Sequence, residues 1–243
     1  MSIAIVTNAV DENELAQIRA LGAATLEGGK ELRILSFPGL EQPFDLTWSH
    51  KPALQEAFSV ANPAYSHFIY LEDDLRLTFT NFRYYVCYSD KLACHSLIPA
   101  FLRVEYNHTK NDIFSSDIPS GIRIDDRPSV ELDSFRFINS DFPYMGMFVM
   151  NRAQMLEYTM TRSFDRERSA EVHSWWIAER SAMGLTWEAV PDGYTSRYVI
   201  PIDLASRRPS PSCYVHHLPG NYTNRDEIAD PPYGELRMAD AFY

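Results

Sequence analysis

Short runs of apolar, β-branched and aromatic residues alternate along the chain with longer segments of helical periodicity. The short runs predict buried β-strands, which we place at residues 3–6, 32–37, 67–71, 100–106, 143–150, 187–190, 198–202 and 213–217. The longer segments predict helices at residues 11–21, 51–60, 81–96, 152–158 and 169–183. Strands and helices alternate over the first 71 residues, which is typical of an α/β fold with a mostly parallel central sheet flanked by helices.

Two segments show neither the apolar runs typical of buried strands nor helical periodicity. Residues 107–132 are rich in Asn, Asp, Ser, Pro and Gly, which predicts a long surface loop with room for a hairpin, and the tail after residue 217 is rich in Pro and Gly. With 243 residues, 45% of them apolar, the chain can bury one large core without a disulfide or a structural metal. Because no repeat or linker interrupts it, we expect a single domain over residues 1–243.

Charge and cysteine content narrow the classes of partner. The net charge is −11, from 22 basic and 33 acidic residues, and no basic run interrupts it, so nucleic acids and anionic membranes are poor partners. The three cysteines, Cys87, Cys94 and Cys213, include no C-x-x-C pair, which favours a reducing compartment. The first residues lack a secretory signal and no run is long enough to span a bilayer. We therefore expect a cytoplasmic protein, at most peripheral to the inner face of a membrane.

Three consecutive carboxylates follow the apolar strand at residues 67–71, namely Glu72, Asp73 and Asp74. Unpaired carboxylates at the edge of a core repel one another, and a divalent cation relieves that repulsion. Mg²⁺ and Mn²⁺ bind one or two carboxylates together with phosphate oxygens, and ligands of open α/β sheets bind beyond the carboxyl ends of the strands. The alternative is an acidic turn that only caps the next segment.

The run from Phe68 to Leu75 resembles the acidic signature of nucleotide-sugar glycosyltransferases of the GT-A fold, in which an apolar strand ends in Asp-x-Asp or a variant. The resemblance implies a GT-A-like domain whose nucleotide-binding half covers about residues 1–80, with the acceptor half and a C-terminal loop over 81–243. It also implies that Asp74 ligates Mn²⁺ or Mg²⁺ bridging the donor diphosphate. Glu72 would then lie near the ribose, with Asp73 beside it at the nucleotide.

Further residues fit the same resemblance in the first half of the chain. Thr7 and Asn8 follow the first strand and resemble the base-binding loop, although Asn is common in turns regardless of function. His50 and Lys51 open a predicted helix, where a basic side chain and free backbone N–H groups could contact a diphosphate. The alternative for Lys51 is a solvated surface lysine.

Late in the chain, His217 resembles the histidine that closes the metal site of many GT-A enzymes. Side chains alternate along a strand, so His216 and His217 should face opposite sides, and we assign the metal to His217, which adjoins the loop. The alternative is a structural histidine.

An inverting sugar transfer needs a general base, usually a carboxylate. The predicted helix at residues 169–183 resembles the GT-A helix that carries this base, which makes Glu171 the catalytic candidate. Val172 stands where that family has Asp, and this departure leaves a retaining mechanism open. Glu179 falls on the apolar stripe of the same helix, where an ion pair with Arg197 or Arg152 is the structural interpretation.

Together these residues predict a metal-dependent, hexosyltransferase-like enzyme of polysaccharide biosynthesis. It would move a sugar from a nucleoside diphosphate sugar to a hydroxyl of a glycan or glycolipid. Donor choice would depend on side chains around Arg103, residues 141–147 and the loop at 107–132. The alternatives are a metal-dependent nucleotidyltransferase, which usually has a Gly-rich basic loop that is missing after the first strand here, and a catalytically inactive carbohydrate-binding domain of the same fold.

Overall fold

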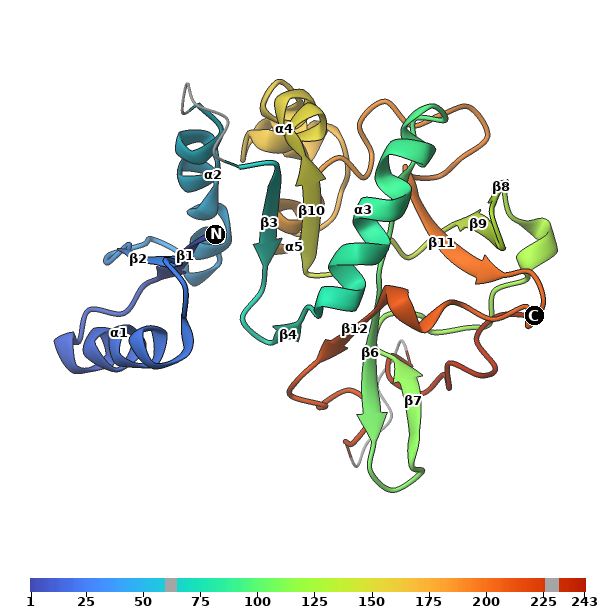
Figure 1. Cartoon of the computed structure of the whole chain (residues 1–243), viewed down its shortest axis with the longest axis horizontal. Helices are drawn as coiled ribbons and strands as arrows, with labels where there is room; N and C mark the ends of the chain where they lie inside the picture. The colour runs from blue at the N-terminus through green and yellow to red at the C-terminus, as the bar shows by residue number, and fades with distance from the viewer. Residues whose placement is uncertain (60–64, 226–231) are drawn as a thin grey trace. The chain divides into compact units, whose positions relative to one another are not determined.

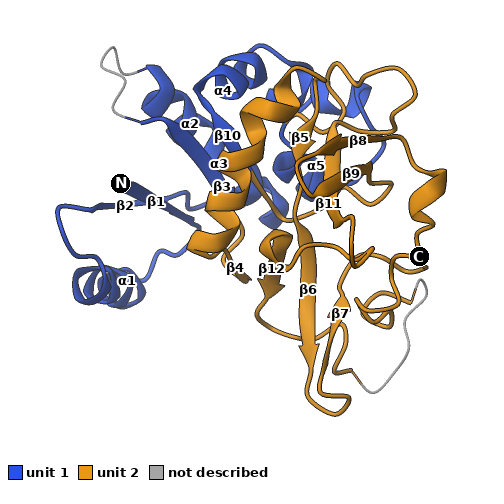
Figure 2. Ribbon diagram, turned by 45° about the vertical axis from the view of Figure 1, so that its right-hand side comes forward, with its two compact units in different colours: residues 1–70, 149–184 blue, residues 71–148, 185–243 orange. Residues whose placement is uncertain are grey.

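The computed structural model describes residues 1–59, 65–225 and 232–243, and the chain divides into two compact units (Figures 1 and 2). Unit 1 comprises residues 1–70 and 149–184, and unit 2 comprises residues 71–148 and 185–243. Each unit is therefore completed by segments that are distant in sequence. The nucleotide-binding and acceptor halves expected from the sequence are defined by what they bind, and they remain a prediction.

Unit 1 begins with two parallel strands joined by a helix. Strand β1 (Ser2–Thr7) pairs along its full length with β2 (Glu31–Ser36). Between them, α1 (Glu12–Thr25) starts at an N-cap in which the Asp11 side chain accepts a hydrogen bond from the backbone N–H of Asn13. Helix α1 packs closely on β2 at Gly22, where a Cβ would lie 2.2 Å from a methyl group of Leu32, so a larger residue would require the Leu32 side chain to shift.

The rest of unit 1 is mostly helical. Strand β3 (His67–Leu71) forms a two-stranded sheet with β10 (Met147–Asn151). The α-helices are α2 (His50–Ser59), α4 (Arg152–Thr159) and α5 (Ile177–Ala182), and the 3₁₀ turns are η1 (Pro43–Trp48), η3 (Arg162–Phe164) and η4 (Arg168–Glu171). Helix α2 was predicted to end at Val60, which lies outside the described residues.

Unit 2 contains two four-stranded sheets and a long helix, α3 (Phe79–Ala93). One sheet has the order β5-β11-β9-β8, with strands Ile98–Pro99, Tyr198–Asp203, Phe135–Asn139 and Ser129–Leu132. The other has the order β4-β12-β6-β7, with strands Leu75–Arg76, Tyr214–His217, Leu102–Asn107 and Asp112–Ser115. Two further 3₁₀ turns are η2 (Ile124–Asp126) and η5 (Pro211–Cys213).

The predicted mostly parallel central sheet is wrong. In each four-stranded sheet of the described chain, one pairing is parallel, β11 with β5 or β12 with β6, and the other two are antiparallel. A parallel pair needs a long crossover, whereas an antiparallel pair can be closed by a tight turn. Tight turns close the β6–β7 and β8–β9 hairpins, with Asn111 and Asp133 in the left-handed region at φ 53° and 54°. The fold is therefore mixed α/β.

Two predicted elements are also wrong, and one loop holds more structure than expected. Residues 187–190 form turns rather than a strand. The helix predicted at 169–183 is broken between η4 and α5, where the backbone N–H of Trp175 donates to Nδ1 of His173 at 3.1 Å. Such local side-chain bonds compete with the helical hydrogen bonds. The loop predicted at 107–132 contains β7 and β8, and β7 forms a hairpin with β6.

Helix α3 anchors the strand that carries the two late histidines. Thr78 and Asn81 form a reciprocal capping box at its start. The Nδ2 group of Asn81 also donates to the carbonyl oxygens of Ser212 and Tyr214, each at 2.8 Å. One buried side chain thus holds the helix start and the beginning of β12 together.

We predict that Asn81→Ala lowers the free energy of unfolding by about 2–3 kcal/mol, since it removes a cap and leaves buried carbonyl groups unsatisfied. Thr80→Ala, an exposed position in the same helical turn, is the matched control and should change it by less than about 0.5 kcal/mol. Equilibrium urea unfolding measures both. Equal, small effects would show that Asn81 does not anchor β12.

Candidate functional site

The three carboxylates predicted to bind metal lie in unit 2, in the turn between β3 and β4. The turn is closed by the backbone N–H of Leu75, which donates to the carbonyl oxygen of Glu72 at 3.2 Å. Strand β4 then pairs with β12, so His217 stands opposite Leu75, and the backbone N–H of Leu218 donates to the carbonyl oxygen of Asp74 at 2.7 Å. Asp73 is exposed, whereas Glu72 and Asp74 are half-buried.

This pairing brings Asp74 and His217 together, although they are 143 residues apart in sequence. Nε2 of His217 lies 3.1 Å from Oδ2 of Asp74. The opposite ring nitrogen, Nδ1, is hydrogen-bonded to Oε1 of Glu105, which is completely buried on β6. The other Glu105 oxygen accepts the backbone N–H groups of Tyr222 and Thr223 at 3.0 and 2.7 Å. A buried histidine therefore stands between two carboxylates.

The carboxylates set the charge of this histidine. Burial and the nearby Arg103 lower the pKa of His217, but the hydrogen bond that it makes to Glu105 and the negative charges of Asp74 and Glu105 outweigh them and raise the pKa above its usual value. The prediction that the two histidines face opposite sides is confirmed: His217 is buried at Asp74, and His216 is half-buried opposite Arg76.

A polar atom at this pair lacks a partner. Oδ1 of Asp74 is buried and has no hydrogen-bond partner among the described residues. An oxygen and a nitrogen donor side by side, with a carboxylate orienting the far side of the imidazole, fit the ligand chemistry of Mn²⁺ or Mg²⁺. In the described part of the chain no group of three or more His, Cys, Asp or Glu side chains is arranged to hold a metal. The pair would thus leave most positions around the cation to water and substrate oxygens.

A second charged group lies on the same face of β6. Arg103 donates two hydrogen bonds to Asp117, at 2.9 and 2.5 Å, and both side chains are largely buried. The guanidinium carbon lies 5.0 and 5.6 Å from the ring centres of Tyr144 and Tyr222, a cation–π arrangement. Arg103 is the residue around which donor choice was expected to depend, and it lies two positions before Glu105 on β6, hence on the same face.

Glu72 is held in a tight pocket of unit 2. The Tyr144 hydroxyl donates to Oε1 of Glu72 at 3.0 Å, and the backbone N–H of Glu72 donates to the carbonyl oxygen of Gly146 at 3.1 Å. Gly146 has φ +63°, and a Cβ there would lie 2.6 Å from Oε2 of Glu72. Burial raises the pKa of Glu72 to about 7, against the opposing effects of Tyr144 and Arg103. The close approach of Gly146 to this carboxylate was not predicted from the sequence.

Of the predicted nucleotide-contact residues, Thr7, Asn8, His50 and Lys51 lie in unit 1, whereas Glu72 and Asp73 lie in unit 2. Thr7 ends β1, and its hydroxyl accepts the backbone N–H of Ala9 at 3.1 Å, in the turn that contains Asn8. His50 is buried, with its ring centre 4.0 Å from that of Tyr70 and Nδ1 2.6 Å from the carbonyl oxygen of Thr47. These contacts are typical of a buried histidine with a structural role.

Lys51 is only 6% exposed, so the alternative of a solvated surface lysine is wrong. Its Nζ is hydrogen-bonded to the Tyr158 hydroxyl. Burial lowers the pKa of Lys51 well below its usual value, and burial together with the nearby Lys51 does the same for His50. Neither group is an exposed cation of the kind expected to meet a diphosphate.

The two candidate bases differ in their surroundings. Glu171 is exposed at the last residue of η4, so the expectation that it lies at a helix N-terminus is wrong. Glu179 lies in the first turn of α5, and its Oε2 is buried without a hydrogen-bond partner among the described residues. Arg152 instead donates to the carbonyl oxygens of Tyr65 and Phe58. Within unit 1, the described residues show no ion pair between Glu179 and Arg152, and the alternative partner, Arg197, lies in unit 2.

Comparison with known proteins returns no match: no family model, curated protein or solved structure is significantly similar to the chain. The resemblance to GT-A glycosyltransferases therefore stays a hypothesis, and the residues of the site are what carry it. Within the described ranges, no helix has the length and apolar composition that crossing a bilayer would require.

The raised pKa of Glu72 gives a testable dependence of stability on pH. A carboxyl whose pKa is higher in the folded than in the unfolded chain favours folding below the unfolded value, about 4.3, and this contribution is lost as the pH rises through about 7. Glu72→Gln keeps an acceptor for Tyr144 and removes the charge. In metal-free buffer, we expect its melting temperature relative to the parent to rise between pH 5 and pH 8 by about 2–4 °C.

Asp73→Asn is the matched control, because it removes the same charge from the exposed neighbouring position. Its melting temperature should follow that of the parent over the same pH range. If the melting temperature of Glu72→Gln shows no pH-dependent gain over the parent, the pKa of Glu72 is not raised in the folded protein.

Proposed function

We propose that this protein is a metal-dependent glycosyltransferase that moves a sugar from a nucleoside diphosphate donor to a hydroxyl of a glycan or glycolipid. One observation carries the proposal. The strand-end carboxylate Asp74 and the late histidine His217 meet at 3.1 Å, and Asp74 keeps a buried oxygen without a partner among the described residues. The proposal rests on this site and on its residue types rather than on the fold, which departs from the mostly parallel expectation.

In this proposal Asp74 and His217 hold Mn²⁺ or Mg²⁺. The cation would offset negative charge on the departing diphosphate. Glu105 fixes the ring of His217 through Nδ1, so Nε2 is the nitrogen presented on the Asp74 side. Because Glu105 is itself held by two backbone N–H groups, the orientation of the histidine is set before any ligand binds.

The neighbouring groups would recognise the donor. Arg103 is kept rigid by Asp117 and by the rings of Tyr144 and Tyr222. Glu72 already accepts a hydrogen bond from Tyr144 and would accept a further one from a ribose hydroxyl. A fixed arrangement of this kind lowers the ordering cost of donor binding.

The direct test is a thermal-shift screen of nucleoside diphosphate sugars with and without Mn²⁺, followed by assays of donor hydrolysis and sugar transfer. A donor at 100 times its dissociation constant should add about 2.7 kcal/mol of stability. Asp74→Asn should abolish both the metal-dependent shift and turnover while the fold survives. Near-normal turnover of Asp74→Asn with Mn²⁺ would refute the proposal. Glycan binding that persists in excess chelator without turnover would indicate a binding domain, and pyrophosphate release from a nucleoside triphosphate would indicate a nucleotidyltransferase.

We predict that His217→Ala weakens Mn²⁺-supported activity by about 10-fold or more, since metal ligands and the groups that orient them have effects of this size. His216→Ala is the matched control, because the same side chain is removed one position away on the opposite face of β12. Activity titrated with Mn²⁺ should show a higher metal requirement for His217→Ala alone. Equal, small effects in both variants would remove histidine from the metal site.

The identity of the general base can be decided between Glu171 and Glu179. Glu171 stays a prediction from its position alone, whereas the buried oxygen of Glu179 has no partner among the described residues, which makes Glu179 the better candidate. We expect Glu179→Gln to lower turnover by about 10²–10⁴, without lowering the melting temperature, because the carboxylate oxygen that it replaces has no hydrogen-bond partner to lose among the described residues.

Glu171→Gln, an identical change at an exposed position, should leave turnover near that of the parent. Turnover and melting temperature of both variants give the answer. The assignment would be reversed if Glu171→Gln lost turnover in a stably folded protein while Glu179→Gln kept it.

A further inference from the structure

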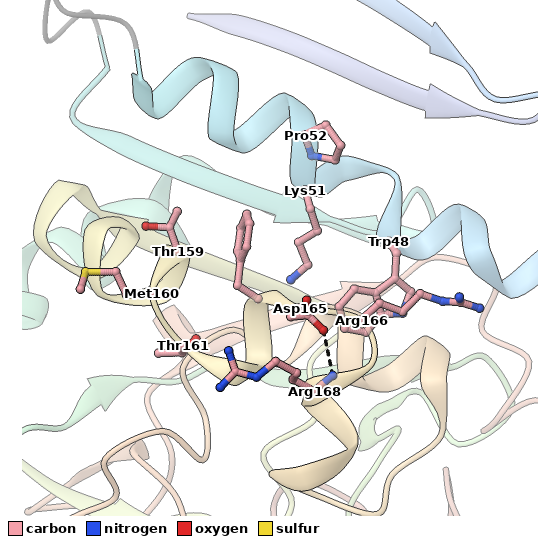
Figure 3. Close-up of a pocket in the computed structure, with 10 residues that line it drawn as sticks. Trp48, Lys51, Pro52, Thr159, Met160, Thr161, Asp165, Arg166 and Arg168 are labelled. Atoms are coloured by element: carbon pink, nitrogen blue, oxygen red, sulfur yellow. Dashed lines mark hydrogen bonds between the residues drawn. The ribbon is translucent and has the colours of Figure 1, made fainter.

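Unit 1 contains a pocket of about 470 Å³ that the glycosyltransferase proposal does not use. Figure 3 shows the residues that line it. They come from η1, α2, the end of α4 and the η3–η4 segment: Trp48, Lys51, Pro52, Thr159, Met160, Thr161, Phe164, Asp165, Arg166 and Arg168. A concave site lined by apolar and aromatic groups with a few convergent polar groups is the usual form of a small-molecule site.

The amine of Lys51 is the chemically distinctive group of this pocket. Its Nζ lies 5.0, 4.3 and 5.3 Å from the ring centres of Trp48, Tyr158 and Phe164. Ring faces favour the ammonium form by about 0.5–2 kcal/mol, whereas loss of water around a buried cation costs several kcal/mol. The desolvation cost is the larger of the two, and it lowers the pKa of Lys51.

Besides Lys51, the pocket is lined by two arginines and by one carboxylate, Asp165, which accepts the backbone N–H groups of Glu167 and Arg168. Arg166 is ion-paired with Asp45 at 2.5 Å. Arg168 is exposed, and its guanidinium has no ion-pair partner among the described residues. In Figure 3, Lys51 and Arg168 extend into the pocket from opposite walls. An anionic group of a ligand would thus find a cation across the pocket from the Lys51 amine.

We propose that Lys51 is a nucleophilic amine that forms an imine with an aldehyde bearing a phosphate or carboxylate group, with Arg168 binding the anion. The Lys51 nitrogen attacks the carbonyl carbon, and the C=O π electrons move to oxygen, which takes a proton. The Tyr158 hydroxyl, hydrogen-bonded to Nζ, can relay that proton. Loss of water then leaves a C=N bond, so amine and aldehyde give imine and water with no oxidant or reductant.

The inference differs from the predicted diphosphate contact of Lys51, because burial makes this amine harder to protonate, and an amine that gives up its proton more readily is a weaker partner for a diphosphate but a better nucleophile. It does not depend on the proposed function, since the reaction needs neither a nucleotide sugar nor a metal. Its success or failure in metal-free buffer therefore leaves the glycosyltransferase proposal untouched.

The experiment is reductive trapping on the whole protein. Pyridoxal 5′-phosphate, glyoxylate and pyridoxal serve as the phosphate-bearing, carboxylate-bearing and uncharged-substituent probes, each with borohydride, and mass spectrometry locates the modified residues. The chain has four lysines, and exposed Lys30, Lys91 and Lys110 act as internal controls. At pH 7 we expect Lys51 to be modified at least about 10-fold faster than Lys30, since one pKa unit changes the fraction of neutral amine tenfold.

The pH profile and two variants separate the parts of the proposal. Labelling of Lys51 should level off at a lower pH than labelling of Lys30. Arg168→Gln should raise the half-saturating concentration of the anionic probes and leave that of pyridoxal unchanged, while Arg19→Gln, an exposed arginine elsewhere in unit 1, should change neither. Labelling of Lys51 no faster than that of Lys30, or with the same pH profile, overturns the imine site. An Arg168→Gln effect that is equal for all probes overturns the anion contact.

Discussion

The candidate site depends on one buried charge, the carboxylate of Glu105. It is completely buried in the middle of β6, where an uncompensated carboxylate would cost several kcal/mol. Its three partners come from two places in the chain: the imidazole of His217 on β12 and the backbone N–H groups of Tyr222 and Thr223 in the loop that follows. To satisfy Glu105, the chain must place β12 beside β6 and turn the loop back over it. The orientation of His217 toward Asp74 follows from that requirement.

The other charged groups on and near this face of β6 are also hydrogen-bonded to partners. Arg103 is neutralised by Asp117 through two hydrogen bonds and is flanked by two tyrosine rings. The carboxylate of Glu72 accepts a hydrogen bond from the Tyr144 hydroxyl. Several buried side-chain atoms of the described residues have no hydrogen-bond partner, and the carboxylate oxygens among them belong to Asp74 and, in unit 1, Glu179. Polar groups that a protein buries without a partner are uncommon, and they mark the places where a ligand or a reacting proton completes the structure.

Local pattern predicted the elements well, because periodicity reports which face of a segment is buried. Strand β3 has the predicted bounds, and opposite faces for His216 and His217 are confirmed. Pairing direction could not be predicted, since it depends on turns such as those at Asn111 and Asp133, whose left-handed backbone carries little sequence signal. The break before α5 depends on one hydrogen bond to His173. Asp74 and His217 were predicted from a motif and its place in the chain. The contacts of Glu105 with His217 and of Gly146 with Glu72 are seen only once the strands are paired.

Each unit contains a buried titratable side chain, and the pKa values of the two are shifted in opposite directions. The difference has chemical consequences. In unit 2, His217 is buried between carboxylates, and its pKa rises, so that it carries positive charge more readily or exchanges its proton for a metal. In unit 1, Lys51 is buried among aromatic rings, and its pKa falls, so that it sheds its proton. Carboxylates at hydrogen-bond distance prepare a side chain to hold a cation, whereas loss of water around a buried amine prepares it to act as a base or nucleophile, even with ring faces nearby that favour its charged form. The surroundings of each group, more than its residue type, therefore decide which chemistry it can perform.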